Sequence, residues 1–380
     1  MKVIVLGAGL VGGPMVLDLA GDLDIQVTVV DINEKNLSKF TGKGDIKIIQ
    51  ADLSKPEIIG QLVKPFDMVL SAVPGFMGFQ TLKTIIEAGK NVVDIAFFPE
   101  DMFDLDALAK KHSVTAVSDM GVAPGMSNLL VGYADHLLDK TEKVLIYVGG
   151  LPKIRKWPYQ YKAVFSPADV IEEYTRPARY IQYGREVVKP ALSEPELMDF
   201  DGIGTLEAFN SDGLRSIART VKGEFMVEKT LRYPGHIELM KVFRESGFFS
   251  QDEIDLHGVR IKPIDFTSRL LFEQWELHEG EEDITVMKVI VEGVRSLERV
   301  TLTWDLFDTF DHETGIHSMA RTTGYAATTV LRMIKSGMFT QKGVIAPEMI
   351  GKDEKCVDYI LRGLAERGVI YRKKLTTATL

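Results

Sequence analysis

The amino-acid sequence predicts an α/β protein with two domains, a doubly wound parallel sheet followed by an α+β domain with a mixed or antiparallel sheet. Three observations predict this fold. Short apolar runs alternate with amphipathic stretches over the first 125 residues, a glycine-rich turn directly follows the first run, and longer alternating runs begin near residue 140. A chain of 380 residues is also long enough for about two domains.

The first domain shows the pattern of strands that are buried on both faces. Its apolar runs are nearly continuous, and stretches with helical periodicity separate them, which is typical of a parallel sheet covered by helices on both sides. The predicted strands are Val3–Leu6, Val27–Val30, Lys47–Ile49, Met68–Ser71, Asn91–Ile95 and Val114–Ser118. The predicted helices are Gly12–Ala20, Pro56–Val63, Thr81–Ala88 and Phe103–Lys111. In such a fold the ligand binds at the carboxyl ends of the strands.

The rest of the chain is expected to form a second domain and a helical C-terminal segment. Strands are predicted at Lys143–Val148, Lys162–Phe165, Leu206–Phe209, Ile284–Val291 and Arg299–Asp305. Ser318–Ile334 has the periodicity of a long amphipathic helix. We therefore expect domains over residues 1–125 and 126–317, with C-terminal helices over residues 318–380 that pack back on the first domain.

Charge and composition exclude several classes of function. The formal net charge of −9 argues against a nucleic-acid partner and suits a small-molecule ligand. No apolar run reaches the roughly 18 residues of a membrane span, so we expect a cytoplasmic protein without a membrane partner. Cys356 is the only cysteine, which excludes an intrachain disulfide, and the histidines show no ligand spacing. No metal site is predicted.

The segment Gly7-Ala8-Gly9-Leu10-Val11-Gly12 matches the G-x-G-x-x-G pattern of dinucleotide-binding turns. It lies between the first predicted strand and the first predicted helix, which is the context that the pattern requires. In this Rossmann arrangement Gly7 makes the tight turn, Gly9 admits a pyrophosphate, and Gly12 lets the helix pack on the strand. Free N–H groups and the helix dipole hold the phosphates, so the segment is predicted to bind a dinucleotide.

Asp31 ends the second predicted strand and is predicted to select the cofactor. A carboxylate at this place can accept hydrogen bonds from both ribose hydroxyls of NAD and repels the 2′-phosphate of NADP. Ile32 and Asn33 offer no cation for that phosphate, so the sequence predicts NAD. The alternative is that Asp31 is an ordinary turn residue.

Two further turns are candidates for direct contact with the cofactor. Asp52 and Leu53 follow the third predicted strand, where the adenine ring is expected. Ala72, Val73 and Pro74 follow the fourth, close to the expected nicotinamide ribose. Either turn could instead be an ordinary connection between a strand and a helix.

Six polar residues are candidates for catalysis or substrate binding. Asp94 and Asp119 follow predicted strands at the crevice, where a carboxylate can accept a proton or direct a water; capping and loop hydrogen bonds are the alternative. In the second domain, two arginines are candidates for a substrate carboxylate, an aspartate for an ammonium group and a histidine for proton transfer. These are Arg215, Arg232, Asp212 and His236. The alternatives are surface salt bridges for the arginines and a structural role for the histidine.

The sequence resembles the glutamate-forming saccharopine reductases and their relatives, the lysine 6-dehydrogenases, over nearly its whole length. Besides the glycine pattern, the resemblance is carried by Gly121–Gly125, Tyr147–Pro152, Tyr161–Pro167, Thr230–Tyr233, Gly235, Ser318–Tyr325 and Gly343–Glu348. Several such segments in the same order are specific at the level of the family.

Details within these segments favour the lysine 6-dehydrogenases. Ala123 and Val148 stand where saccharopine reductases tend to have an aspartate and a cysteine, and Ile146–Pro152 with Ile171–Arg179 is similar to the lysine enzymes. The resemblance implies NAD-dependent oxidation of the ε-amine of L-lysine to an imine. Ammonia and 2-aminoadipate 6-semialdehyde are then released, and the semialdehyde cyclises to piperideine-6-carboxylate.

Two other functions stay open. A saccharopine reductase or a carboxy-polyamine synthase of the same family uses glutamate or a diamine as its amino partner, where the lysine enzymes use ammonia. A nucleotide-binding regulatory protein would keep the fold without turnover, although the retained Asp119, Asp212, Arg215 and Arg232 argue against it. Because an antiparallel sheet commonly offers an edge or a face for pairing, we expect a homodimer or a larger homo-oligomer.

Overall fold

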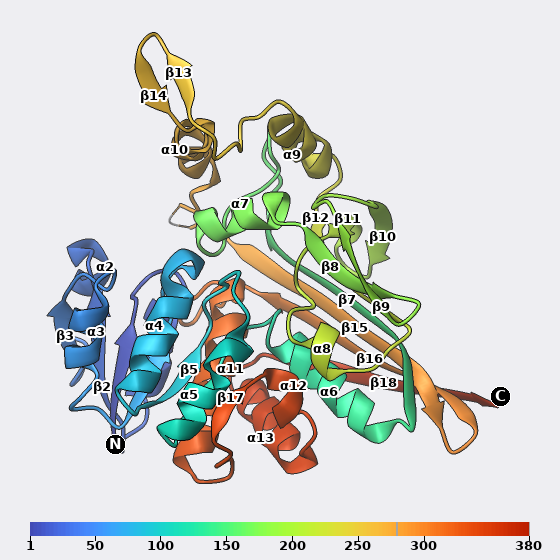
Figure 1. The fold of residues 1–380 in the computed structure, drawn as a ribbon, viewed down its shortest axis with the longest axis horizontal. Coiled ribbons are helices and arrows are strands. Elements are labelled where there is room, and N and C mark those ends of the chain that lie inside the picture. Colours follow the sequence, from blue (N-terminus) through green and yellow to red (C-terminus); the bar gives the residue numbers. More distant parts are fainter. Residues whose placement is uncertain (279, 380) are drawn as a thin grey trace. The chain divides into compact units, whose positions relative to one another are not determined.

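The computed structural model describes residues 1–278 and 280–379, which fold into two compact units (Figure 1). The first unit consists of Met1–His136 and Ala320–Ile370, and the second of Leu137–Met319 and the residues from Tyr371 onward. The boundaries after His136 and before Ala320 therefore lie later in the chain than the expected residues 125 and 317, because the helix that follows residue 125 belongs almost wholly to the first unit. A third boundary lies after Ile370, where the chain returns to the second unit.

The first unit is a doubly wound α/β domain, which confirms the predicted fold class. Over residues 1–136 and 320–370 its parallel sheet has seven strands in the order β17-β6-β5-β4-β1-β2-β3. The strands are β1 (Lys2–Leu6), β2 (Gln26–Asp31), β3 (Lys47–Gln50), β4 (Met68–Ser71), β5 (Asn91–Asp94), β6 (Thr115–Val117) and β17 (Gly343–Ile345). The strand order reverses direction at β1, between β2 and β4, so the ligand crevice is expected at the carboxyl end of β1.

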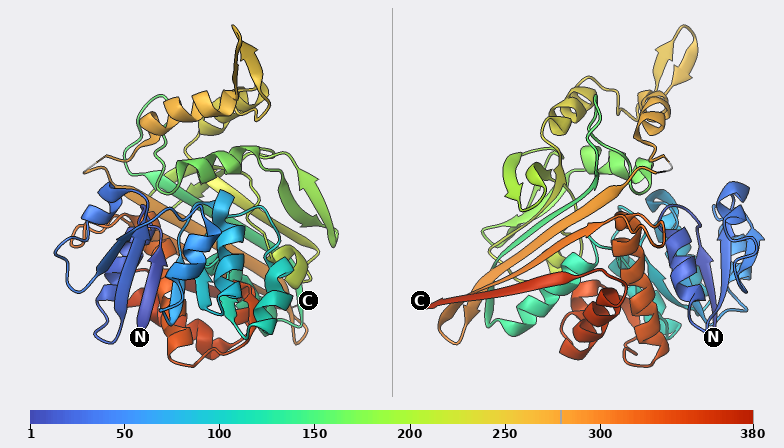
Figure 2. Two further views of the ribbon diagram at one scale, coloured as in Figure 1. Left: turned by 60° about the vertical axis from the view of Figure 1, so that its left-hand side comes forward. Right: turned by 180° about the vertical axis from the view of Figure 1, so that it is seen from behind.

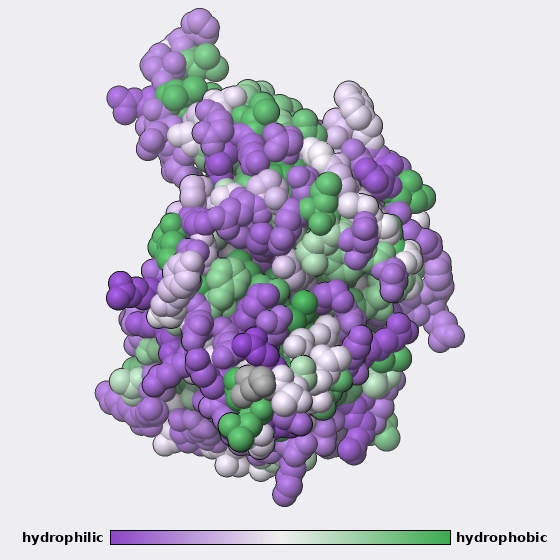
Figure 3. Space-filling model, turned by 90° about the vertical axis from the view of Figure 1, so that its right-hand side faces the viewer, coloured by the Kyte–Doolittle hydropathy of each residue, from purple (hydrophilic) through white to green (hydrophobic). Residues whose placement is uncertain are grey.

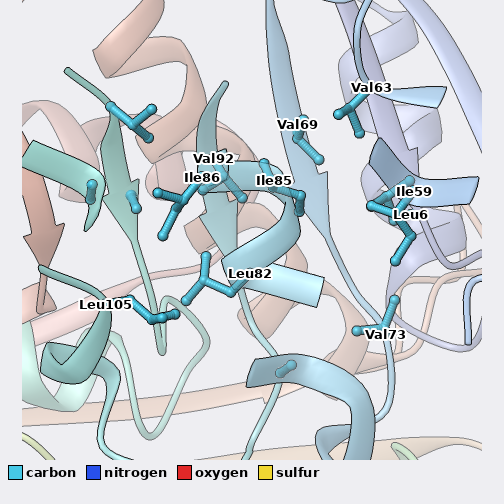
Figure 4. Close-up of a cluster of buried hydrophobic side chains, with 14 of the residues drawn as sticks. Leu6, Ile59, Val63, Val69, Val73, Leu82, Ile85, Ile86, Val92 and Leu105 are labelled. Carbon is cyan, nitrogen blue, oxygen red and sulfur yellow. The ribbon is translucent and has the colours of Figure 1, made fainter. Parts of the chain in front are cut away.

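Helices cover this sheet. They are α1 (Gly12–Ala20), α2 (Glu34–Ser38), α3 (Pro56–Leu62), α4 (Gly75–Glu87), η1 (Met102–Leu105), α5 (Asp106–Lys111), α6 (Met126–Leu137), α11 (Ser318–Lys335), α12 (Pro347–Ile350) and α13 (Glu354–Ala365). Leu82, Ile85 and Ile86 of α4 are fully buried and point toward Val69 of β4 and Val92 of β5 (Figure 4). Helical spacing places the three on one face, and burying each aliphatic side chain stabilises the fold by about 1.5–3 kcal/mol.

The C-terminal helices belong to the first unit, and an ion-pair network joins them to α1. Arg332 of α11 donates hydrogen bonds to Asp18 at 2.6 Å and to Asp22 at 2.7 Å. Arg367, after α13, donates to Asp18 at 2.6 Å, and the Thr328 hydroxyl donates to the same carboxylate at 2.5 Å. Asp18 lies in the helix that follows the glycine turn, so this network fixes the position of that helix.

The second unit is built on a mixed sheet. Over residues 137–278, 280–319 and 371–379 the main path of this sheet is β10-β11-β12-β7-β15-β16-β18, and β8 and β9 extend it beside β12. The strands are β7 (Lys140–Pro152), β8 (Ala178–Gln182), β9 (Arg185–Lys189), β10 (Glu196–Phe200), β11 (Gly204–Asn210), β12 (Phe225–Arg232), β13 (Ile254–Leu256), β14 (Val259–Ile261), β15 (Asp283–Arg295), β16 (Glu298–Thr309) and β18 (Tyr371–Thr379). The helices are α7 (Pro167–Thr175), α8 (Ile217–Thr220), α9 (His236–Glu245) and α10 (Pro263–Trp275).

Three elements differ from the sequence prediction. The predicted strand Lys162–Phe165 is wrong, since its backbone meets the end of α10, where Ala163 N donates to Trp275 O at 2.8 Å, and no strand lies beside it. Helix α4 begins six residues before the predicted start, and a Cβ on its Gly78 would lie 2.6 Å from that of Ala96, so close packing explains a glycine there. The last residues form β18 on the edge of the second sheet, not a helix.

Two kinds of feature are absent from residues 1–278 and 280–379. None of their helices is long and apolar enough to cross a membrane. No three His, Cys, Asp or Glu side chains among them are grouped so that they could hold a metal ion.

Candidate active site

The turn between β1 and α1 is shaped by its glycines. Gly7 has a φ of +99°, and a Cβ there would lie 2.5 Å from the carbonyl oxygen of Ala72. A Cβ on Gly12 would lie 2.2 Å from the Gly7 oxygen, so α1 can approach β1 only with glycine at this place. At Gly9 nothing lies within 4 Å of the position of a Cβ. This leaves beside the backbone the space that a pyrophosphate needs.

The first turn of α1 can hold an anion. Its N-cap residue, Val11, supplies no side-chain hydrogen bond to the helix, and the neighbouring Leu10 is 45% exposed. The first N–H groups of a helix have no partner within the helix, so without a capping side chain they are oriented to bind phosphate. The residues present therefore fit a dinucleotide.

The Asp31 carboxylate is held beside this turn. Its Oδ2 accepts a hydrogen bond from Ala8 N at 2.7 Å, and its Oδ1 accepts one from Asn33 N at 2.8 Å. Asp31 is partly exposed, and the next residue, Ile32, is 62% exposed. Asn36 Nδ2 adds a longer hydrogen bond to Oδ2 at 3.4 Å. A carboxylate has about four acceptor positions, so Asp31 keeps capacity for about one ribose hydroxyl after these bonds.

The two other predicted cofactor turns lie at different places along the sheet edge. Ala72 N donates to Leu6 O at 2.8 Å, which places the turn of Ala72, Val73 and Pro74 directly beside the end of β1. The turn of Asp52 and Leu53 follows β3, the outermost strand on that side. There the Asp52 carboxylate accepts hydrogen bonds from the backbone and hydroxyl of Ser54, and the Leu53 side chain is buried.

Asp94 and Asp119 follow neighbouring strands and share an electrostatic environment. Asp94 is fully buried at the end of β5, where its Oδ2 accepts from Ala96 N at 3.3 Å and Ser118 Oγ at 3.5 Å. Its Oδ1 has no partner at hydrogen-bond geometry among the described residues, although the Ser71 hydroxyl lies near enough to lower the pKa of this carboxyl group. Burial raises the pKa of Asp94 to about 8, and the negative charge of Asp119 acts in the same direction. Asp119, also buried, takes a left-handed backbone with a φ of +58°.

In the second unit, Arg232 ends β12 inside a cluster of buried aromatic and acidic side chains. Its Nη2 donates to the Glu173 carboxylate at 2.5 Å, and its Nε donates to the Tyr174 hydroxyl at 3.1 Å. The guanidinium also lies 4.5 Å from the centre of the Tyr161 ring, and a third hydrogen bond goes to Leu231 O at 2.9 Å. The positive charge of Arg232 is thus balanced by a carboxylate of the same chain.

His236 extends the same cluster. Its Nδ1 lies 2.8 Å from the Tyr159 carbonyl oxygen, which can only accept, so Nδ1 carries the proton. Its Nε2 therefore accepts from the Tyr174 hydroxyl at 2.9 Å. Burial and the nearby charge of Arg232 lower the pKa of His236 to about 3. The imidazole is neutral near pH 7, and both its nitrogens are engaged within the cluster.

Asp212 lies close to a second buried carboxylate, Glu228. The Asp212 carboxylate accepts two hydrogen bonds of 2.8 Å from Arg179, so it already has a cationic partner. Arg215 is buried and takes a φ of +51°. Glu228 accepts from Ser211 Oγ at 2.7 Å, and burial raises its pKa to about 8.

The candidate residues thus form two groups, one in each unit. The first unit brings together the glycine turn, Asp31, the turn at residues 72–74, Asp94 and Asp119 along one edge of its sheet. The second unit places Asp212, Arg215, Arg232 and His236 on β12, the turn after β11 and the start of α9.

Sequence reasoning missed Glu173, Tyr174 and Glu228. One signal for Glu228 was present, because Glu228, Thr230 and Arg232 alternate along β12 and so share one face of a strand. Three polar residues on the same face of a buried strand indicate a polar cluster. Glu173 and Tyr174 lie on α7, inside the segment Ile171–Arg179 that carries the family resemblance, but no local pattern links them to Arg232, which they meet only through the tertiary fold.

Comparisons with known proteins agree with this architecture. Residues 3–117 match the family model of the saccharopine dehydrogenase NADP binding domain, and residues 121–369 match that of the saccharopine dehydrogenase C-terminal domain. The solved structure of apo saccharopine dehydrogenase (L-Glu forming) from Saccharomyces cerevisiae superposes with a TM-score of 0.78 at 20% identity, covering 99% of both chains.

Relatives are found over most of the chain. The mitochondrial alpha-aminoadipic semialdehyde synthase of Mus musculus is 23% identical over 99% of this chain and 48% of its own length. The carboxyaminopropylagmatine dehydrogenase of Synechocystis is 21% identical over 93% of each protein. This chain spans about half the length of the mouse relative. Because the two family models together cover nearly all of the chain, it belongs to the saccharopine dehydrogenase family.

Proposed function

We propose that this chain is an NAD-dependent dehydrogenase that oxidises L-lysine at its ε-carbon and releases ammonia and 2-aminoadipate 6-semialdehyde, which cyclises to piperideine-6-carboxylate. The observation that carries the proposal is Asp94, a buried carboxylate at the crevice edge of the nucleotide-binding sheet with one oxygen that lacks a partner among the described residues. Membership of the saccharopine dehydrogenase family supports an oxidoreductase that acts on amino-acid amines.

The choice of NAD rests on Asp31. The family model and a 25% identical relative from Saccharomyces cerevisiae, saccharopine dehydrogenase (NADP(+), L-glutamate-forming), carry NADP in their names. In this chain a carboxylate lies beside the glycine turn, and an exposed isoleucine follows it, where binding of a 2′-phosphate calls for a cation. We therefore assign NAD, held by the glycine turn, the first turn of α1, Asp31 and the turn at residues 72–74.

Asp94 is the proposed proton acceptor. A lysine ε-ammonium has an unperturbed pKa of about 10.4, so removing its proton near pH 7 costs roughly 4–5 kcal/mol in water. A carboxyl group with a pKa of about 8 is a far better proton acceptor than an ordinary aspartate. Bound NAD supplies the acceptor for the hydride that leaves the ε-carbon. Water then adds to the resulting imine, the carbon–nitrogen bond breaks, and Asp119 is the proposed carboxylate that directs this water.

In the second unit we propose Arg215 and Arg232 as ligands of a substrate carboxylate and Asp212 as the partner of an α-ammonium. The observed pairs set a condition on this assignment. Arg232 forms an ion pair with Glu173, and Asp212 forms one with Arg179. A substrate that binds Arg232 or Asp212 therefore has to displace the partner within the chain. His236 is neutral and fully engaged, so we assign it a positioning role in place of proton transfer.

The second candidate is a saccharopine reductase or a carboxy-polyamine synthase, in line with the names of the relatives. Val148, which stands where saccharopine reductases tend to have cysteine, pairs with Thr230 on the neighbouring strand and so lies beside the strand that carries Arg232. This favours a changed substrate. Assaying ammonia release with L-lysine and with saccharopine in parallel tests the choice, since only the lysine reaction yields free ammonia.

A further inference from the structure

Arg232 and Glu173 form an ion pair away from the surface of the second unit. Figure 3 shows hydrophilic residues over most of the face that it displays, and charged side chains usually lie at such a surface. Helix α7, which carries Glu173, lies between the mixed sheet and helices α9 and α10 (Figure 2). The side chain of Arg232 is 2% exposed and that of Glu173 is 19% exposed. Because a buried ion pair seldom stabilises a fold more than apolar residues do, stability alone does not account for this pair.

The guanidinium of Arg232 keeps donors for a ligand and is held from several sides. It has five N–H donors, and three of them go to the Tyr174 hydroxyl, the Leu231 carbonyl oxygen and the Glu173 carboxylate. Within the described part of the chain, these bonds leave two donors for a ligand. The Tyr161 ring, 4.5 Å away, also supports the guanidinium. The arginine therefore stays in place when Glu173 moves away from it.

The surroundings of Glu173 contain more carboxyl groups than the one guanidinium balances. Burial raises the pKa of Glu173, the charge of Arg232 lowers it, and the charge of Asp169, one turn earlier on α7, raises it. Burial also raises the pKa of Glu228, and the charge of Glu173 acts in the same direction. Three carboxyl groups thus act on one another beside a single cation, which favours the binding of a further cation.

The Tyr161 hydroxyl gives a separate indication that a polar ligand binds here. It is buried and has no hydrogen-bond partner among the described residues. Burial raises the pKa of this hydroxyl, the charge of Arg232 acts against the rise, and the charge of Glu173 adds to it. The hydroxyl therefore lies within electrostatic range of both members of the pair. A buried polar group without a partner is unfavourable, and a charged ligand group beside the pair can bond to it.

Glu173 is more accessible to an ammonium group than Asp212 is. The side chain of Asp212 is 4% exposed, and its carboxylate accepts two hydrogen bonds of 2.8 Å from Arg179. Glu173 is held by one hydrogen bond from Arg232, and its side chain is 19% exposed. An ammonium group that approaches Arg232 therefore meets Glu173 first.

We propose that Glu173 binds the α-ammonium of the amino-acid substrate while Arg232 binds its carboxylate. The substrate carboxylate takes the place of Glu173 at the guanidinium, and the freed Glu173 side chain turns to the ammonium group on the same substrate carbon. One ion pair becomes two, so no buried charge is left without a partner. The inference rests on the proposed binding of a substrate carboxylate at Arg232, and it adds the residue that selects α-amino acids over plain carboxylates.

Ligand binding tests this assignment. Calorimetry is carried out with NADH, which cannot accept a hydride, and with either L-lysine or 6-aminohexanoate, which is lysine without its α-ammonium. The wild type should bind L-lysine at least about 10-fold more tightly than 6-aminohexanoate. In Glu173→Gln, L-lysine should bind about 10- to 100-fold more weakly, because a charge-assisted hydrogen bond is lost. 6-Aminohexanoate should bind at least as tightly as before, because a neutral amide competes less for Arg232.

Glu172→Gln is the matched control, since the neighbouring Glu172 is 38% exposed and pairs with Arg176. It should leave both affinities unchanged. A Glu173→Gln chain that keeps the preference for L-lysine, or that binds both ligands more weakly by the same factor, overturns the inference. Loss of the preference in Asp212→Asn and not in Glu173→Gln also overturns it, and assigns the ammonium group to Asp212.

A second variant covers the case in which Glu173→Gln does not fold. Glu173→Asp keeps the charge opposite Arg232 but is one methylene shorter, so the preference for L-lysine should fall several-fold while the affinity for 6-aminohexanoate stays the same. A folded Glu173→Asp chain with the wild-type preference overturns the inference, and a wild type that binds neither ligand overturns the proposed function as well. A wild type that binds L-lysine through Glu173 and does not oxidise it refutes the proposed reaction and keeps this assignment.

Discussion

The guanidinium of Arg232 donates a hydrogen bond to the Glu173 carboxylate at 2.5 Å while it lies 4.5 Å from the centre of the Tyr161 ring. The side chain of Arg232 is 2% exposed and that of Glu173 is 19% exposed, so the arginine is buried and its carboxylate partner is largely shielded from water. Removing one partner of such a pair leaves the other charge buried without compensation, which costs more than the pair contributes.

We therefore predict that Arg232→Met lowers the free energy of unfolding by about 3 kcal/mol. The measurement is urea denaturation followed by circular dichroism at pH 7. The double variant Arg232→Met/Glu173→Gln is the control, and it should lose less than the sum of the two single variants because it leaves no buried charge. A single variant within about 0.5 kcal/mol of the wild type would show that the pair does not matter for stability.

Substrate binding gives a separate prediction for the two arginines. In folded protein, Arg215→Ala and Arg232→Ala should each raise the KM for lysine by about 100-fold and leave the affinity for NAD unchanged, because a charge-assisted hydrogen bond is lost. NAD affinity is measured by calorimetry without substrate. An unchanged KM for lysine in either variant would show that the replaced arginine does not bind the substrate and has a structural role only.

Cofactor preference tests Asp31. The change Asp31→Ser with Ile32→Arg removes the repulsion of a 2′-phosphate and adds a cation for it. The ratio of kcat/KM for NAD to kcat/KM for NADP should fall at least about 100-fold, in line with a few kcal/mol of charge-assisted contact. Asp45→Ser, at an exposed position of the same unit, is the control. An unchanged ratio in the double variant contradicts the NAD assignment.

The pH dependence of turnover tests Asp94. Only its ionised form accepts a proton, so kcat/KM should rise with pH through a midpoint of about 8. Asp94→Asn should lose about 10²–10⁴-fold in kcat/KM and with it this ionisation. A variant that keeps the wild-type rate and profile excludes Asp94 as the base.

Stability gives an independent readout of the same group. The folded-state pKa of Asp94 is raised above its value of 3.8 in the unfolded chain, so its contribution to stability is fully present below about pH 4. That contribution is lost as the pH rises toward 8. The Asn variant does not ionise, so it should gain stability relative to the wild type between pH 5 and 8. A constant difference over this range contradicts the raised pKa.

The C-terminal network offers a test of the fold. Arg332→Met leaves Asp22 without its cation and Asp18 with Arg367 alone, so the free energy of unfolding should fall by about 2–3 kcal/mol. Lys335→Met, which removes an exposed pair with Asp24, is the matched control and should change it by less than about 1 kcal/mol. Equal losses in both variants would show that the network does not hold α11 to α1.

Local sequence patterns were sufficient for much of the first unit. Burial requires apolar residues in the strand Val3–Leu6, and close backbone contacts require glycine in the turn that follows it. Both requirements can be recognised from residue type alone. The same holds for the fourth and fifth strands, where apolar runs end in Ser71 and Asp94. The segment Lys162–Phe165 shows the limit of this reasoning, because an apolar pattern reports burial but not the presence of a neighbouring strand.

The candidate site was less accessible to sequence reasoning in the second unit. Arg232 and Asp212 were identified as polar residues near turns, but their partners Glu173 and Arg179 lie 59 and 33 positions away in the chain. Such pairs depend on how helix α7 and strand β8 pack beside β12. Whether an arginine is open to a ligand or already paired therefore could not be predicted from its neighbours in the sequence.

The reaction itself is the most direct test of the central claim. NADH formation at 340 nm is measured with NAD and a panel of L-lysine, saccharopine, L-ornithine and diamines, and free ammonia is assayed in parallel. The account predicts turnover with L-lysine and one ammonia released for each NADH formed. Turnover with saccharopine alone, or no turnover by a protein that still binds NAD, would contradict it.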